Sequence, residues 1–326
     1  MKRELLNYLC CPACHSDLVL HVDSGDQREI DEGVLRCLEC SKSYDIKSGI
    51  PRFLPAEVAD EVRRNVARFG YEWAWLSSTS DKNEIEFRSY LGEIQLESLA
   101  SRAVLDAGCG MGKFLALSGK YGAKVAIGVD LAEQSVANAY KNTRSLDNVH
   151  VVQADLYHLP LRQGFDFIYS IGVLHHLIKP EAGFQKLVQL LREQGEIFAW
   201  VYGYEGNEIY VRFLDPFRRL TSRLPLWMNK ALTAILATLL WILILLVYLP
   251  LDWAGMRKLP FHDYFLYFYR LGFRFFWGTV FDKAIPPISN YYRKEEFNAW
   301  FSRAGLSNVS VVHRNSNSWS GWGRKL

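Results

Sequence analysis

The chain has 326 residues, of which 49% are hydrophobic and 22% charged, a balance that fits a globular protein and excludes a disordered one. This length allows one large domain and a smaller one. The net charge of +3 gives no argument for a nucleic-acid partner, because any basic patch would have to be local. Residues 1–9 carry charges and lack the apolar core of a signal peptide, which predicts a cytoplasmic protein.

Two C-x-x-C pairs lie near the start of the chain. The two-residue gap in each pair lets both thiolates reach one ion, and two such pairs complete a tetrahedral sulfur site. The 22 residues between the pairs slightly exceed the usual zinc-ribbon gap, and a hairpin that turns at Gly25-Asp26 would absorb the excess. We therefore expect a structural zinc, with two redox pairs or free thiols as the alternatives. The expected ligands are Cys11, Cys14, Cys37 and Cys40.

Three segments around these cysteines, residues 5–12, 44–46 and 49–55, resemble a small zinc-ribbon protein that activates tRNA and translation-factor methyltransferases. The resemblance implies a zinc-ribbon domain over residues 1–55. Such a ribbon, fused ahead of a catalytic domain, is expected to pack against that domain as a folding staple. A nucleic-acid finger is the alternative.

A glycine-rich turn follows residues 103–105, which are typical of a buried strand. Its glycines follow the order D-x-G-x-G-x-G, whereas a dinucleotide fingerprint needs G-x-G-x-x-G. Glycine lets backbone N–H groups approach a ligand closely, and a helix expected over 113–121 directs its N-terminal dipole toward a negative group. The stretch therefore predicts a site for a nucleotide-like ligand.

Polar side chains follow the next three expected strands. The second strand ends in Asp130, 24 positions beyond Asp106, where a carboxylate can accept both ribose hydroxyls. The third strand is followed by Asp155, and the fourth by His175 and His176. Ligands of open parallel sheets bind beyond these carboxyl ends, so we expect the side chains to surround one site.

These motifs, in this order, resemble class I S-adenosylmethionine (SAM) methyltransferases, in particular the type 11-like group. The resemblance implies an α/β, Rossmann-like, doubly wound sheet of seven strands, with SAM bound by a core over residues 101–202. It also implies that an aromatic stretch at 69–75, within a helical linker over 56–100, covers the cofactor or substrate mouth, although that aromatic density equally fits a core. The cofactor-binding residues implied are Asp106, Gly108, Gly110, Gly112, Asp130, Leu131, Asp155, Leu156 and Ser170.

The remaining core elements come from two separated segments. Pro180 is expected to open a helix that Gly195 ends, followed by a fifth strand over 196–202. Residues 291–326 predict a further helix and a strand hairpin that complete the core. Residues 203–290 are therefore expected to form a helical, apolar and aromatic insertion.

The insertion holds 21 uncharged residues at 231–251, a length that can span a bilayer. A single crossing would separate the last strands from their sheet. The candidate for a second crossing, 261–281, carries charged residues that each cost about 3 kcal/mol at mid-bilayer. We therefore expect a substrate lid or a peripheral membrane contact through 226–281, with a buried cap, an oligomer contact or a hairpin span as alternatives.

Methyl transfer from SAM requires alignment of the acceptor and exclusion of water, and an oxygen or nitrogen acceptor can also need a base. His175 and His176 are the candidate bases, and one of them is expected to be structural. Four residues at or just after the end of the fifth strand are also placed to face the acceptor: Tyr202, Tyr204, Glu205 and Asn207.

The leading prediction is a methyltransferase for a small-molecule or lipid-linked acceptor at the inner face of the membrane. The ribbon suggests tRNA or protein methylation as an alternative, against which the low overall charge counts. A non-catalytic interaction module is a further alternative, and the intact carboxylates count against it. A nicotinamide dehydrogenase is disfavoured by the position of the third glycine.

Overall fold

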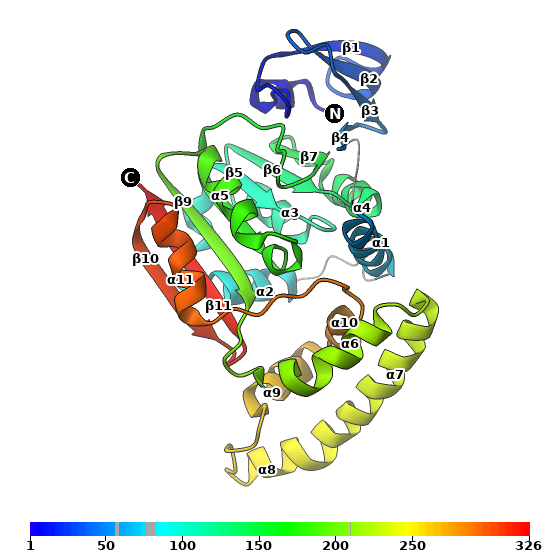
Figure 1. Cartoon of the computed structure of the whole chain (residues 1–326), viewed down its shortest axis with the longest axis vertical. Coiled ribbons are helices and arrows are strands. Elements are labelled where there is room, and N and C mark those ends of the chain that lie inside the picture. The colour runs from blue at the N-terminus through cyan, green and yellow to red at the C-terminus, as the bar shows by residue number, and fades with distance from the viewer. Residues whose placement is uncertain (56–58, 76–81, 209) are drawn as a thin grey trace.

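A computed structural model describes residues 1–55, 59–75, 82–208 and 210–326 (Figure 1). The side chains of residues 72–75, 82, 213, 214 and 217 lie outside this description, and with them the tryptophans of the predicted lid stretch. One sheet of eleven strands runs through the ribbon and the core in the order β1-β2-β3-β4-β7-β6-β5-β8-β9-β11-β10. The strands are β1 (Leu18–Gly25), β2 (Ile30–Cys37), β3 (Ser43–Lys47), β4 (Ile50–Phe53), β5 (Ala103–Ala107), β6 (Val125–Asp130), β7 (Val149–Ala154), β8 (Phe165–Ile171), β9 (Leu191–Tyr202), β10 (Leu306–Arg314) and β11 (Ser318–Lys325).

Seven neighbouring strands of this sheet, in the order β7-β6-β5-β8-β9-β11-β10, form the predicted Rossmann-like core. The first five are parallel, and the hairpin of β10 and β11 closes the sheet through antiparallel pairing of β11 with β9. The chain reverses its winding direction between β5 and β8, which creates the crevice where open α/β sheets bind ligands. The seven-stranded, doubly wound prediction is confirmed for the core.

The ribbon lengthens this sheet by four antiparallel strands, which the sequence did not predict. Its last strand, β4, pairs in parallel with β7, so that Arg52 lies opposite Gln153 and Phe53 opposite Ala154. The Gly25-Asp26 turn is present, because the Asp26 carboxylate accepts hydrogen bonds from the backbone N–H groups of Arg28 and Glu29. The ribbon therefore covers an edge of the core sheet that would otherwise be open.

Helices cover both faces of the sheet (Figure 1). On one face, Phe184 of α5 and Phe297 of α11 join the core cluster that contains Leu105; on the other, Phe87 of α2 and Leu115 of α3 join the cluster that contains Val104. The central strand is therefore buried on both sides, as its continuous apolar run predicts. These helices are α1 (Asp60–Trp75), α2 (Lys82–Leu91), α3 (Lys113–Lys120), α4 (Glu133–Thr143), α5 (Pro180–Leu190) and α11 (Lys294–Arg303).

One predicted boundary is wrong. Helix α5 ends at Leu190 rather than at Gly195, and β9 already begins at Leu191, which pairs with Phe165. A bulge then separates this pair from the next one, Phe167 with Glu196, so residues 192–195 belong to an irregular strand. The helical apolar spacing includes Leu191, and the polar residues after it give no signal of a strand, so the sequence conceals the true end of the helix.

The insertion forms a helical unit at one end of the molecule. Residues Leu226–Trp253 form a continuous helix of 28 residues that contains a π-helical turn (Ile244–Tyr248) between α7 and α8, and its most apolar window of 18 residues has a mean hydropathy of 2.7. Only 22% of its most apolar window is buried, against α9 and α10. Gly272 divides the second apolar stretch into two short helices, so no second long span forms there. The insertion helices are α6 (Asp215–Thr221), α7 (Leu226–Leu243), α8 (Leu249–Trp253), α9 (His262–Leu271) and α10 (Phe273–Ala284).

Candidate functional site

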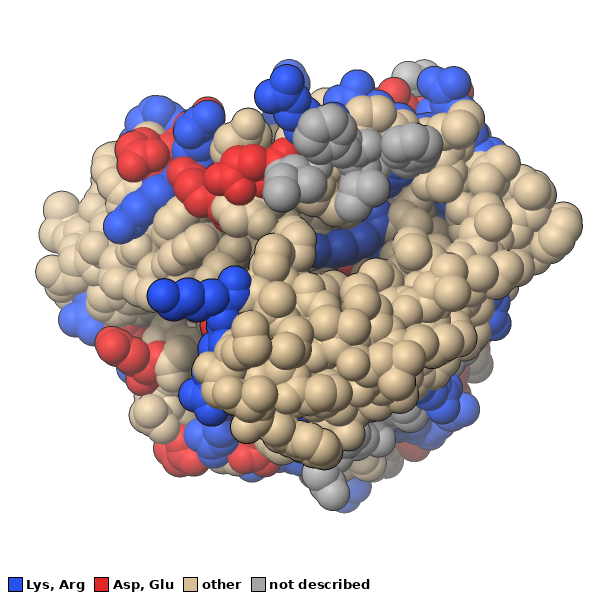
Figure 2. Space-filling view, turned by 90° about the horizontal axis from the view of Figure 1, so that it is seen from below, with Lys and Arg blue, Asp and Glu red and all other residues tan. Residues whose placement is uncertain are grey.

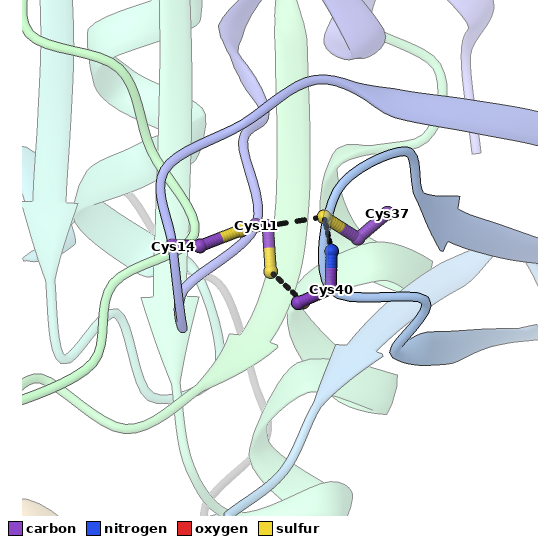
Figure 3. Close-up of side chains that lie close together, drawn as sticks. All are labelled: Cys11, Cys14, Cys37 and Cys40. Atoms are coloured by element: carbon purple, nitrogen blue, oxygen red, sulfur yellow. Dashed lines mark hydrogen bonds between the residues drawn. The ribbon is translucent and has the colours of Figure 1, made fainter.

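The four cysteines predicted as metal ligands converge in the ribbon (Figure 3). All four sulfur atoms lie within 4.8 Å of one another, with 3.6 Å between the Sγ atoms of Cys11 and Cys40 and 3.4 Å between those of Cys14 and Cys37. A tetrahedral zinc with Zn–S bonds of about 2.3 Å places its sulfur atoms roughly 3.8 Å apart, close to these values. The cluster fits a structural zinc held by four thiolates.

The glycine turn after β5 depends on backbone conformations that favour glycine. Gly108 has φ of +91°, and a Cβ there would lie 2.3 Å from Val173. Gly110 has φ of +52°, and its N–H donates to Asp130 Oδ2 at 3.0 Å. Both residues line a large cavity. Gly112 is absent from that lining, and a Cβ there would lie 3.0 Å from Ala139, so its role is close packing of α3 on α4.

The cavity has a volume of about 570 Å³, within the usual range for small-molecule sites. At one end it is lined by Asp106, Asp130 and Asp155, which follow or close the neighbouring strands β5, β6 and β7. The apolar side chains of Leu131 and Leu156 line it beside them. The structure thus brings together the three carboxylates and the two leucines that the sequence placed around a nucleoside.

The three carboxylates differ in their hydrogen bonds. Asp130 accepts from the N–H groups of Gly110 and Ala132, at 3.0 and 2.8 Å, which fixes its carboxylate toward the cavity. Asp155 accepts from the N–H of Tyr157 at 3.2 Å. Asp106 Oδ2 is buried and makes no hydrogen bond of good geometry with the described residues, although the Tyr169 hydroxyl interacts with the carboxyl. Burial outweighs this interaction and raises the pKa of the Asp106 carboxyl to about 8. An unsatisfied polar atom on the cavity wall fits a ligand that supplies the missing partner.

Ser170, predicted as a cofactor residue, does not line the cavity. Its hydroxyl is fully buried and donates to the carbonyl of Ala107 at 2.8 Å. It therefore joins β8 to the end of β5 and acts on the turn only by holding the two strands together.

The predicted histidine bases are poorly placed for proton transfer. His175 is fully buried, does not line the cavity and lies with its ring centroid 3.9 Å from that of Tyr202. His176 lines the cavity, but its Nδ1 donates to the carbonyl of Ile288 at 2.7 Å. Burial lowers the pKa of His176 to about 4 and that of His175 well below its ordinary value. Both rings are weak bases that build the wall between the core and the insertion.

The other end of the cavity is formed by the insertion. Helices α9 and α10 contribute Tyr264, Asp282 and Lys283, opposite Tyr202 at the end of β9. The Tyr202 hydroxyl donates to Asp282 Oδ2 at 3.2 Å, and burial raises the pKa of Asp282 to about 6. Of the four residues that the sequence placed before the acceptor, Tyr202 and Asn207 line the cavity. Tyr204 and Glu205 do not, and Glu205 Oε2 instead accepts from Trp319 Nε1 at 3.2 Å.

Sequence reasoning missed Asp282 and Lys283. No motif surrounds them, since they lie about 80 residues beyond Tyr202 in an aromatic helix. The available signal was a lone acidic–basic pair in an otherwise apolar run, which is costly to bury without a use.

Comparison with known proteins agrees with this geometry. Residues 105–199 match the family described as Methyltransferase domain (Methyltransf_11), and residues 2–49 match the Trm112p-like protein family. The tRNA U34 carboxymethyltransferase of Pseudoalteromonas translucida (strain TAC 125) is 31% identical over 146 residues, which are 41% of this chain and 45% of that protein. The enzyme of the same name from Tolumonas auensis (strain DSM 9187 / NBRC 110442 / TA 4) is 33% identical over 116 residues, 35% of this chain and 36% of the relative.

The chain thus spans less than half the length of these curated relatives. Among solved structures, magnesium protoporphyrin IX methyltransferase (ChlM) from Synechocystis PCC 6803, with bound SAH, covers 83% of this chain and 90% of its own length. Its sequence identity is 12% and its TM-score 0.42, too low to add to the assignment. From the family match, the strand order and the cysteine cluster, the chain carries a class I SAM-dependent methyltransferase domain of the Methyltransf_11 family behind a Trm112p-like segment.

Proposed function

We propose that this protein transfers a methyl group from SAM to a small-molecule or lipid-linked acceptor at a membrane surface. The observation that carries the proposal is a single cavity with two different ends. One end is lined by the motif residues of the methyltransferase domain, and the other by side chains of the insertion. A donor and an acceptor bound at these ends would meet inside one cavity.

The residues at the first end suit SAM. Asp130 offers the remaining lone pairs of a fixed carboxylate to the ribose hydroxyls, while Leu131 and Leu156 offer apolar contact to the adenine ring. Asp155 lies beside Leu156 and can accept from the adenine amino group. When bound, SAM supplies a methyl group attached to a positively charged sulfur.

Asp282 is the proposed base at the acceptor end. It lines the cavity and holds the Tyr202 hydroxyl, so it can take a proton directly or through that hydroxyl. In the step, a bond forms between the acceptor oxygen or nitrogen and the methyl carbon, and the carbon–sulfur bond breaks with its electron pair left on sulfur. The acceptor's proton passes to Asp282. The walls of the cavity align the two partners.

The membrane part of the proposal is supported by the exposed face of the long helix. Figure 2 shows a broad surface without charged residues beside a hollow that contains Lys or Arg side chains. Large apolar side chains are exposed along this helix, from Trp227 at 69% to Trp253 at 82%. Between residues 215 and 263 the chain carries six Lys or Arg and three acidic residues, and the exposed cations among them are Arg219, Arg223, Arg257 and Lys258. An apolar face with cationic flanks suits the headgroup region of an anionic membrane, and we place it at the cytoplasmic leaflet.

Peripheral contact is preferred to a span because the chain returns to its sheet. After the insertion, β11 pairs with β9 and β10 pairs with β11, so both strands lie in the same sheet as the rest of the core. The helices that follow α8 are 10 and 12 residues long, too short for a second crossing.

Two measurements on the full chain test this function. Calorimetry with S-adenosylhomocysteine (SAH) is expected to give saturable binding that Asp130→Ala weakens. Incubation with methyl-tritiated SAM and a total lipid extract of the source organism is expected to transfer label to the organic phase. If SAH binds but no lipid is labelled, the proposed cofactor site stands and the proposed lipid-linked acceptor is rejected.

The names of the curated relatives favour tRNA as a second candidate acceptor. Those proteins are named for carboxymethyl transfer to tRNA U34. Against this candidate, the surface beside the hollow is apolar, whereas RNA binding needs a basic one. Total tRNA in the same labelling assay separates the two: label that ribonuclease releases from the tRNA would establish the tRNA acceptor.

A further inference from the structure

The Lys283 side chain occupies an unusual position in the cavity wall. It projects from the end of α10, and its ammonium lies 5.1 Å from the ring centroid of Tyr264, 5.3 Å from that of Tyr210 and 6.0 Å from that of Tyr202. Within the part of the chain that the structure describes, the ammonium forms no ion pair or hydrogen bond.

The three aromatic rings offset only part of the free-energy cost of desolvating the Lys283 ammonium. Cation–π attraction requires the cation within about 6 Å of the ring centroid, and these distances lie at the outer part of that range. The Lys283 side chain is half-buried and faces the cavity, so a ligand that displaces water from the cavity must provide hydrogen-bond acceptors for the three N–H groups of the ammonium. Burial lowers the pKa of Lys283 to about 8, as expected when such acceptors are missing. The site therefore lacks an anion or acceptor that a ligand can provide.

The neighbouring carboxylate does not meet this need. Asp282 points to the Tyr202 hydroxyl, and its attraction to Lys283 is weaker than the effect of burial on the ammonium. Figure 2 shows Lys or Arg side chains in a hollow beside a broad surface without charged residues.

We propose that Lys283 binds an anionic group of the acceptor, so that the substrate is an amphiphilic anion whose apolar part extends toward the exposed face of α7. This inference rests on the proposed function and narrows its substrate class. The anion holds the reactive hydroxyl or amine beside Asp282, while the apolar part remains in the lipid. Carboxylates and phosphates share this chemistry.

A pair of simple amphiphiles tests the inference without knowledge of the natural acceptor. Dodecyl phosphate and dodecanol share a chain and differ in charge. In calorimetry with the SAH-loaded full-length protein, dodecyl phosphate is expected to bind at least about tenfold more tightly, as one charged hydrogen-bonded contact provides. Lys283→Met should abolish this preference and leave dodecanol binding unchanged. Lys186→Met removes the same charge from an exposed position on α5, outside the cavity and away from the insertion, and should retain the preference.

Each other outcome overturns the inference. Equal binding of the two amphiphiles by the wild type, or an equal loss in both lysine variants, would show that Lys283 does not select the anion. Weakened SAH binding in Lys283→Met alone would assign the ammonium to the cofactor. Since SAH binding by the wild type is measured in the same titration, failure of the inference is distinguishable from failure of the methyltransferase assignment.

Discussion

The apolar stripe on the long helix provides the sharpest test of membrane contact. Ile235, Leu239, Ile242 and Leu246 follow one another at helical spacing, with exposures of 61%, 61%, 46% and 72%. Transfer of a whole leucine side chain from water to an apolar phase is worth about 1.5–3 kcal/mol. Because roughly two thirds of each side chain is exposed, Leu239→Ser with Leu246→Ser should remove about 2–4 kcal/mol of membrane affinity, or about 30- to 700-fold in partitioning.

Sedimentation with vesicles of equal parts phosphatidylcholine and phosphatidylglycerol measures this partitioning. Leu38→Ser with Val312→Ser is the matched control, because these side chains are 63% and 58% exposed on the ribbon and on β10. The control should bind vesicles like the wild type, and both double variants should keep the wild-type melting temperature, since the altered side chains are exposed. Vesicle binding that is equal in all three proteins would refute the assignment of this face to lipid.

Three further predictions concern the metal, the cofactor and the base. Removal of zinc by a chelator, or Cys37→Ser, should unfold the ribbon, because structural zinc contributes roughly 10–16 kcal/mol of binding free energy in small zinc domains; circular dichroism and metal analysis check this, and an unchanged ribbon would exclude the metal. Asp130→Ala should weaken SAH binding about 100-fold or more, since two charge-assisted hydrogen bonds are worth about 1.5–3 kcal/mol each, and Asp130→Asn should lose less. Asp282 acts as a base only when ionised, so turnover should fall as the pH drops through about 6. Asp282→Asn should abolish turnover with unchanged SAH affinity, and an identical pH profile in the variant would dismiss Asp282 as the base.

Much of the core could be predicted from the sequence because its signals are local. The turn at Gly108 and Gly110 needs positive φ angles, and each carboxylate directly follows or closes a strand, so chain position alone places them at one sheet edge. The cysteine site was equally local, since two short C-x-x-C loops determine its geometry. Ser170 shows the limit of a family resemblance, because position beside the site does not decide whether a side chain faces the ligand or the neighbouring strand.

The acceptor end could not be predicted because its parts are distant in sequence. Tyr202 contacts Asp282 only after the insertion folds back over the core. The aromatic sequence of the insertion does not predict which of its side chains face the cavity. The pairing of β4 with β7 has the same cause, since about 100 residues separate Arg52 from Gln153 and no local pattern sets their register. The prediction that His175 or His176 acts as a base failed for another reason. The sequence places both residues near the site, but it does not show the burial that lowers their pKa values.

The junction between β4 and β7 has a consequence for how this molecule can be divided. Without residues 1–55, the outer backbone groups of β7 would face solvent as an unpaired edge, beside the loop that contains Leu131. Such an edge invites intermolecular strand addition. A protein that lacks residues 1–55 should therefore self-associate. The ribbon and the core are best regarded as one cooperative folding unit, in which the ribbon covers the exposed edge of β7.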